Sequence, residues 1–238
     1  MPRALPRLRR GKPDKATRRA DAHPYMGQHN LRESLLLYAV TDTRWLRGRG
    51  LPRAVEEALR GGATCIQLRD KSAGKKLLME EALEIRALCR RHNAPLIIND
   101  DAALAKEAGA DGVHIGQRDM PLQEARRILG KSAVIGVSAH SVQEALDAQE
   151  GGADYLGAGA LFHTGTKSDT SALPLQTLRD ICKAVSIPVV AIGGINAENA
   201  HVLAGSGISG IAVVSAVFAE SDIEAAARKM LLAAGALV

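Results

Sequence analysis

The sequence predicts an α/β protein of the (β/α)8 type, a TIM barrel, and three regularities of the chain support this prediction. From Leu35 onward, short β-branched runs alternate with stretches of helical periodicity. Such alternation within one domain predicts a parallel sheet that is covered by helices. A glycine-containing turn precedes every second strand. The length of 238 residues is close to the ~250 residues typical of this barrel.

Eight short runs are predicted to be strands. They cover residues 35–40, 64–68, 96–98, 112–115, 133–137, 155–157, 189–192 and 210–214. Pro95 and Pro188 stand directly before the third and seventh runs, where a missing N–H is tolerated. An open, doubly wound sheet is the alternative. It normally carries a glycine fingerprint after its first strand, and Thr41-Asp42-Thr43 is not one.

The segments between the strands are predicted to be helices, among them residues 77–90, 142–149 and 175–185. The first of these helices is predicted to place five apolar side chains on one face: Leu77, Leu78, Ala82, Ile85 and Leu88. Glycines are predicted to end four helices in a left-handed conformation, within Gly61-Gly62, at Gly109, within Gly151-Gly152 and within Gly205-Ser206-Gly207.

The charge is distributed unevenly along the chain. Residues 1–34 hold nine Lys or Arg and three Asp or Glu, whereas the remainder holds 22 basic and 23 acidic residues. We therefore predict a basic, disordered N-terminal extension over 1–34 and a catalytic barrel over 35–238. The basic balance belongs to the extension, so no nucleic-acid-binding face is expected. Aromatic residues make up only 3%, which also argues against stacking on bases.

The cysteine pattern and the hydropathy indicate a cytoplasmic protein. Cys65, Cys89 and Cys182 are odd in number and scattered, which is typical neither of a disulfide framework nor of a zinc site. They are expected to be small core side chains in a reducing compartment. No apolar run reaches the ~18 residues that a spanning helix needs, so no membrane partner is expected. The sequence leaves the oligomeric state open.

Polar side chains collect in the segments that follow the predicted strands. In barrels of this type, chemistry takes place on the loops at the C-terminal ends of the strands. These segments are Gln67-Leu68-Arg69-Asp70-Lys71, Asn99-Asp100-Asp101, Gly116-Gln117-Arg118-Asp119, Ser138-Ala139-His140, residues 159–171, Gly193-Gly194-Ile195-Asn196 and Val214-Ser215. We therefore expect one site at this end of the barrel.

Two anion sites are predicted within this set. Gly193 and Gly194 let the backbone approach a phosphate, and Ser215 follows the neighbouring strand; an ordinary tight turn is the plain alternative. The cations of Arg69, Lys71 and Lys167 have no obvious partners in the sequence, which suits a more highly charged anion such as a diphosphate. A solvated loop surface is the plain alternative for these cations.

Asp100 and Asp119 are predicted to hold Mg²⁺. They follow adjacent strands, and Mg²⁺ prefers a few carboxylates together with phosphate oxygens of a substrate. Asp101 is instead expected to cap the following helix. His114 is expected to be a satisfied side chain within a strand, His140 to cap or line the site, and His163 to be exposed.

With these residues in view, the chain resembles the thiamine phosphate synthase family from Leu35 to Phe218. The resemblance is specific because seven motifs occur in order, each after the expected strand. They are Gln67-Leu-Arg-Asp-Lys71, Ile98-Asn-Asp-Asp101, His114-Ile-Gly-Gln-Arg-Asp119, Gly136-Val-Ser-Ala-His140, Thr164-Gly-Thr-Lys167, Ile192-Gly-Gly-Ile195 and Val214-Ser215. His163 departs from the family pattern, because a proline is common at that position.

The resemblance implies a role for each matched residue. The residues implied to bind an aminopyrimidine methyl diphosphate are Gln67, Arg69, Lys71, Asn99, Ser138 and Lys167, and those implied to bind a thiazole phosphate are Thr164, Thr166, Gly194, Val214 and Ser215. Asp100 and Asp119 are implied to hold Mg²⁺, and Arg69, Lys71, Ser138 and Lys167 to take part in catalysis. The implied reaction joins the two rings and releases diphosphate.

Two other functions remain as alternatives. A thiazole tautomerase on a related barrel would use His140 and would need neither metal nor diphosphate pocket. A non-catalytic sensor of a phosphorylated ligand would use the same fold without chemistry. The implied condensation itself needs no general base, since its ring-nitrogen nucleophile carries no proton. This agrees with motifs that contain no Ser-His-Asp or Cys-His arrangement.

Overall fold

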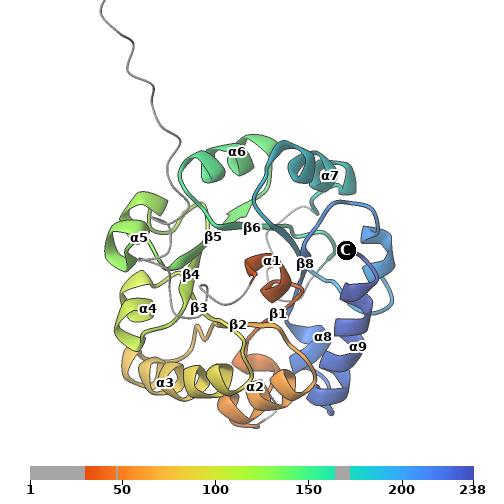
Figure 1. Cartoon of the computed structure of the whole chain (residues 1–238). Coiled ribbons are helices and arrows are strands. Elements are labelled where there is room, and N and C mark those ends of the chain that lie inside the picture. The colour runs from red at the N-terminus through yellow and green to blue at the C-terminus, as the bar shows by residue number, and fades with distance from the viewer. Residues whose placement is uncertain (1–29, 47, 164–171) are drawn as a thin grey trace, which may run out of the picture.

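The computed structural model describes residues 30–46, 48–163 and 172–238, and these form a closed (β/α)8 barrel (Figure 1). Its eight parallel strands lie in sequence order, and the barrel closes where β1 pairs with β8, with Tyr38 opposite Ala212. The strands are β1 (Leu37–Val40), β2 (Cys65–Leu68), β3 (Leu96–Asn99), β4 (Gly112–Ile115), β5 (Val134–Ala139), β6 (Tyr155–Ala158), β7 (Val189–Ile192) and β8 (Gly210–Val213). The predicted fold class and all eight strands are confirmed, with ends that differ by up to two residues.

Helices surround the ring of strands, except for α1, which lies over its centre in the view of Figure 1. They are α1 (Leu31–Ser34), α2 (Leu51–Arg60), α3 (Lys75–Arg91), α4 (Ala102–Ala108), α5 (Leu122–Leu129), α6 (Val142–Glu150), α7 (Leu175–Ala184), α8 (Ser215–Phe218) and α9 (Ile223–Gly235). Short 3₁₀ helices follow β1 and β7, namely η2 (Thr43–Trp45) and η3 (Ala200–Leu203). The expected helix between β7 and β8 is thus only one 3₁₀ turn, because glycine turns at both ends of this connection shorten it.

Two predictions about the helices can be compared with the structure. Each predicted glycine turn contains a residue with positive φ; Gly109, for example, ends α4 in the left-handed region (φ 62°). The prediction of the apolar face of α3 is partly wrong. Ala82, Ile85 and Leu88 are buried, but Leu77 is 50% exposed. Cys89 is buried instead, because a helical period of 3.6 residues places Cys89, and not Leu77, on the same face as Ala82 and Ile85.

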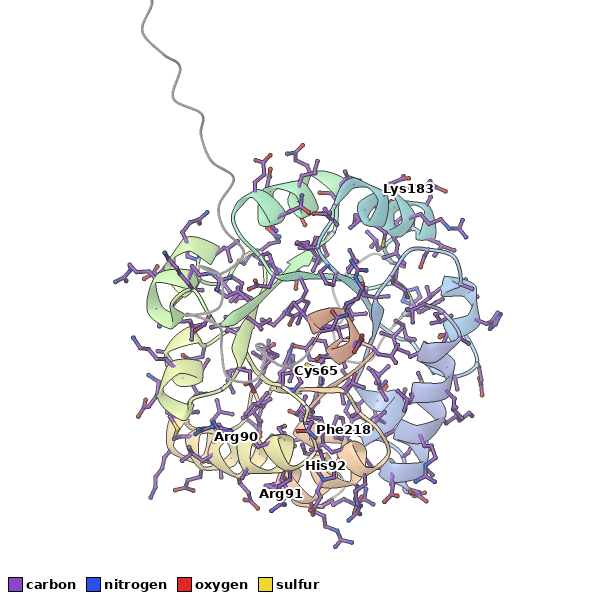
Figure 2. The ribbon with its side chains drawn as sticks, in the orientation of Figure 1. Cys65, Arg90, Arg91, His92, Lys183 and Phe218 are labelled. Carbon is purple, nitrogen blue, oxygen red and sulfur yellow. The ribbon has the colours of Figure 1, made fainter. Side chains whose placement is uncertain are left out.

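The core has two layers, as the alternation along each strand requires. On β1, Leu37 and Ala39 point outward and pack with the helices, whereas Tyr38 and Val40 belong to the cluster inside the barrel. Cys65 of β2, labelled in Figure 2, also belongs to the interior cluster. Cys65, Cys89 and Cys182 are free thiols, and the first two are buried. No helix of the described part of the chain is long and apolar enough to span a membrane.

Helix α1 closes the N-terminal end of the barrel (Figure 1). The Asn30 side chain caps it by accepting a hydrogen bond from the Arg32 N–H. Leu31 packs against the interior cluster, and Arg32 Nη1 donates to Ser209 Oγ at 2.6 Å. The folded part of the chain therefore begins no later than Asn30, five residues before the boundary at Leu35 that the sequence predicts. The cap and the apolar Leu31 are the physical reason. Residues 1–29 lie outside the described part.

Candidate active site

The predicted site residues that the structure describes lie on one rim of the barrel. Gln67 stands near the end of β2, Asn99 ends β3, and Ser138 stands near the end of β5. Asp119 follows β4, and Ser215 begins α8 after β8. Because all strands are parallel, their C-terminal ends form the same rim, so these side chains share one mouth.

A chain of hydrogen bonds crosses the barrel interior beneath this mouth. Gln67 Nε2 donates to the Tyr38 hydroxyl at 2.8 Å, and the Tyr38 and Tyr155 hydroxyls lie 2.8 Å apart. The Tyr155 hydroxyl lies 3.0 Å from His114 Nδ1, and His114 Nε2 lies 3.0 Å from Ser138 Oγ. Burial raises the pKa of both phenols well above their usual value, so both tyrosines are neutral. This chain of hydrogen bonds orients two predicted site residues, Gln67 and Ser138, from inside the barrel.

Two carboxylates meet at the ends of β3 and β4. Burial, followed by hydrogen bonding with Asp119, raises the pKa of Asp100 to about 6, while Asn99 and Lys71 act in the opposite direction. Asn99 Nδ2 donates to Asp100 Oδ2 at 2.6 Å, and Asp119 Oδ2 accepts from the Gly116 N–H at 2.7 Å. A nearby cation would favour the charged form of Asp100, whose pKa is raised.

The donor set fits Mg²⁺ bound together with a substrate. Among the described residues, no cluster of three or more His, Cys, Asp or Glu side chains gathers around one point. Mg²⁺ commonly uses one or two carboxylates and completes its shell with water and phosphate oxygens. Asp100 and Asp119 match that pattern, whereas a dedicated all-protein site would need more ligands.

The neighbouring aspartate has a different task, as predicted. Asp101 is the N-cap of α4, and its Oδ1 accepts from the Leu104 N–H at 2.8 Å. Asp100 has a positive φ of 63°, which turns its side chain away from the direction of a regular strand. The two adjacent carboxylates are thus separated by backbone geometry into a cap and a member of the Asp100–Asp119 pair.

The predicted cations are placed unequally. The charge of Lys71, which is exposed, acts on Asp100. Arg69 is 11% exposed, and its Nη1 lies 3.3 Å from the carboxylate of Asp42. The expectation that Arg69 has no partner was therefore wrong, because pairing of β1 with β2 brings Asp42 beside it.

The predicted phosphate segment is a closely packed glycine turn against the loop that follows β6. Gly194 has φ 67°, and a Cβ there would lie 2.6 Å from the His163 carbonyl oxygen and 2.8 Å from Phe162 Cβ. The Leu161 N–H donates to the Ile192 carbonyl, and Asn199 Nδ2 donates to the Gly194 carbonyl. The turn and its close packing already require glycine. Thr164, Thr166 and Lys167 lie outside the described residues.

The three histidines of the predicted loops and strands differ in their surroundings. His114 is hydrogen-bonded through both ring nitrogens, as expected. Its contact with Ser138 is a Ser–His pair that the motifs did not reveal, but Tyr155 stands where a triad would place a carboxylate. His140 is 46% exposed, and its Nδ1 lies 3.1 Å from Glu144 at the start of α6. His163 is exposed.

Sequence reasoning missed Tyr38, Tyr155 and Asp42 as parts of this site. One signal was present for the tyrosines. The whole chain has three tyrosines, and two of them lie within strands of an aliphatic barrel. A buried tyrosine hydroxyl requires a polar partner, so two of them inside one barrel indicate a polar connection.

Together, the fold and the rim define a class of protein: a (β/α)8-barrel enzyme with a carboxylate pair and cations at its C-terminal face. The family model described as thiamine monophosphate synthase matches residues 37–217. The chain belongs to this family.

Relatives in several organisms support this membership. The thiamine-phosphate synthase of Ruminiclostridium cellulolyticum is 49% identical over 195 residues, which is 82% of this chain and 93% of the relative. That of Chloroflexus aurantiacus is 52% identical over 195 residues, 82% of this chain and 90% of the relative. The solved thiamine phosphate pyrophosphorylase of Pyrococcus furiosus is 40% identical, with a TM-score of 0.81, over 88% of this chain and all of that one.

Proposed function

We propose that the chain is a thiamine phosphate synthase. It joins an aminopyrimidine methyl diphosphate to a thiazole phosphate and releases diphosphate. The observation that carries this proposal is the Asp100–Asp119 pair beside Lys71 at the mouth of the barrel. Two carboxylates with one raised pKa next to a cation suit a metal-bound diphosphate, and family membership supplies the substrates.

The reaction is a substitution in which the leaving group departs first. The carbon–oxygen bond to the diphosphate breaks, and both bonding electrons leave with the diphosphate. The electron-rich aminopyrimidine delocalises the positive charge that remains on carbon. The thiazole nitrogen then forms the new carbon–nitrogen bond with its lone pair, so no proton has to be removed.

The chain's own residues bind and orient the reactants in this proposal. Gln67, Asn99 and Ser138 hold the aminopyrimidine, while Arg69, Lys71 and Lys167 stabilise negative charge as it grows on the diphosphate. Asp100 and Asp119 would hold Mg²⁺, which neutralises further charge on the same leaving group. The thiazole phosphate is assigned to Gly194, Val214 and Ser215 on the opposite part of the mouth, together with Thr164 and Thr166.

A cytoplasmic location remains a prediction that accompanies this function, and the three free cysteines support it. The tautomerase alternative has less support, because His140 is engaged by Glu144 at the start of α6. A sensor would bind the ligands without turning them over.

One coupled assay tests the proposal. The full chain is incubated with the pyrimidine diphosphate, the thiazole phosphate and Mg²⁺, and diphosphate and thiamine phosphate are measured together. We expect equal amounts of both products and none of the joined product when either substrate is left out. A chain that binds the thiazole phosphate and releases no diphosphate would be a tautomerase or a sensor instead.

A further inference from the structure

A buried carboxylate contacts Arg69, one of the residues assigned to the diphosphate. Asp42 follows β1 and is 4% exposed. Its Oδ2 accepts from Arg44 Nη2 at 2.7 Å and from Arg69 Nη1 at 3.3 Å, and its Oδ1 accepts from Arg44 Nε at 3.0 Å. One carboxylate is thus shared by two guanidinium groups. Of these, Arg44 is 59% exposed and Arg69 is 11% exposed.

The backbone around Arg69 is fixed from the same loop. The Arg69 N–H donates to Thr41 Oγ1 at 2.8 Å, and Thr41 Oγ1 donates to the Arg69 carbonyl at 3.0 Å. Thr43 Oγ1 donates to Asp70 Oδ1 at 3.1 Å. The loop after β1 therefore holds Arg69 by its main chain and, through Asp42, by its guanidinium.

The shared arrangement preserves charge as well as direction. A carboxylate paired with Arg69 alone would cancel the charge that an anion needs, but the second guanidinium of Arg44 leaves the trio with a net charge of +1. Hydrogen bonding from Arg44 holds the pKa of Asp42 below its ordinary value, so the carboxylate is ionised at neutral pH. A guanidinium has five N–H donors, and the Asp42 contact engages one of those of Arg69.

We propose that Asp42 is a positioning residue that sets the direction of the Arg69 guanidinium toward the diphosphate, and that Arg44 maintains the positive charge of this part of the mouth. The inference rests on the proposed function, because Arg69 is assigned there to the diphosphate. It adds two residues of the loop after β1, neither of which needs to touch the substrate, to the determinants of diphosphate affinity.

Asp42→Asn separates orientation from charge. The substitution removes one negative charge beside Arg69, so electrostatics alone would tighten anion binding. Loss of the positioned guanidinium acts in the opposite direction. We expect a KM for the pyrimidine diphosphate that is about tenfold higher, with KM for the thiazole phosphate unchanged within about twofold. The inhibition constant of inorganic diphosphate should rise in parallel.

Arg44→Gln provides a second variant, since Arg44 is exposed and its loss leaves the core intact. Here the net charge of the trio falls to zero, so diphosphate affinity should fall again, and more strongly at low ionic strength. Both variants are thus expected to weaken diphosphate binding, although they change the charge of the trio in opposite directions. A purely electrostatic role of Asp42 would give opposite signs for the two.

Asp154→Asn is the matched control. Asp154 also pairs with an arginine, Arg126, at 2.7 Å, but it precedes β6 at the other end of the barrel. It should lower the melting temperature without changing either KM. Tighter or unchanged diphosphate binding in a folded Asp42→Asn protein overturns the inference while leaving the proposed function intact. Absence of diphosphate release from the wild type overturns the proposed function itself.

Discussion

The Nε2 atom of His114 lies 3.0 Å from the Oγ atom of Ser138, and this contact ends the buried hydrogen-bond chain that starts at Gln67. His114 and Ser138 stand on adjacent strands, β4 and β5. The imidazole also packs against the Tyr155 ring, with centroids 5.5 Å apart. The orientation of the serine hydroxyl at the mouth is therefore coupled to side chains that no substrate needs to reach.

His114→Phe tests this coupling. The substitution keeps a ring against Tyr155 but removes both nitrogens, leaving the buried hydroxyls with one partner fewer. We expect the free energy of unfolding to fall by about 1–3 kcal/mol, as is usual for an unsatisfied buried polar group. Catalytic efficiency should also fall, because Ser138 loses its orienting partner. Chemical denaturation and steady-state kinetics measure the two effects. Unchanged kinetics in a destabilised variant would mean that the hydrogen-bond chain has a structural role only.

Asp100→Asn and Asp119→Asn test the proposed Mg²⁺ site. Each removes one of two carboxylate ligands, so the Mg²⁺ concentration at half-maximal activity should rise on the order of tenfold or more. Asp101→Asn is the control next in the chain. Asparagine still caps α4, so its Mg²⁺ dependence should match that of the wild type. An unchanged Mg²⁺ titration in both test variants would remove the metal assignment.

The raised pKa of Asp100 predicts a dependence of stability on pH in the absence of metal. Its pKa is about 6 in the folded protein against 3.8 for an ordinary aspartate, so the folded state binds this proton more tightly. The unfavourable contribution of the ionised group is absent below pH 3.8 and is fully present above pH 6. Asparagine avoids it and tolerates the positive φ of this position.

With a chelator present, Asp100→Asn should therefore melt higher than the wild type at pH 7.5, by roughly 2–4 °C for each kcal/mol of destabilisation that the substitution relieves in a domain of this size. The difference should shrink as the pH falls toward 4. Added Mg²⁺ should narrow it as well, because the cation stabilises the ionised pair in the wild type. Thermal melts at several pH values measure this, and a difference that does not depend on pH would contradict the raised pKa of Asp100.

Gly194→Ala tests the thiazole-phosphate assignment, and Gly205→Ala is its matched control. The two glycines have φ of 67° and 68°, so alanine costs both about 1–2 kcal/mol of backbone energy. A Cβ at Gly194 also meets Phe162 and His163, whereas nothing lies within 4 Å of one at Gly205. Only Gly194→Ala should raise KM for the thiazole phosphate. A rise confined to KM for the pyrimidine diphosphate would mean that the two sites had been exchanged.

Features that depend on residues close together in the sequence were the most predictable. The strands were predictable to within two residues because glycine or proline often marks where a β-branched run begins. Pro95 before Leu96 and Pro188 before Val189 are examples. Asp101 was predictable as a cap because the helix it begins is its own neighbour. The pairing of Asp42 with Arg69 joins residues 27 positions apart and depends on the β1–β2 register, so no local pattern contains it.

The hydrogen-bond chain was hidden for a related reason. Tyr38 and Tyr155 are 117 positions apart, and each occupies a strand position that an aliphatic core residue could also fill. Only closure of the barrel brings the two hydroxyls together. Leu77 was misplaced for a local reason, since an apolar residue one position from the buried stripe of a long helix satisfies the same approximate periodicity.

The last prediction concerns the N-terminal boundary of the fold. A chain of residues 28–238 keeps the Asn30 cap, Leu31 and the Arg32–Ser209 hydrogen bond, whereas a chain of residues 35–238 lacks all three. The first should melt within a few degrees of the full chain, because the segment it loses is polar and lacks hydrophobic periodicity. The second exposes the interior cluster at the N-terminal end of the barrel, so its melting temperature should fall clearly. Helix α1 lies at the end opposite the active site, so both KM values of the second chain should stay unchanged below its melting temperature. Arg32→Ala, which removes only the hydrogen bond to Ser209, should fall between the two chains in stability. If 35–238 melts like 28–238, α1 adds nothing to the barrel, and the boundary belongs at Leu35 as the sequence predicts.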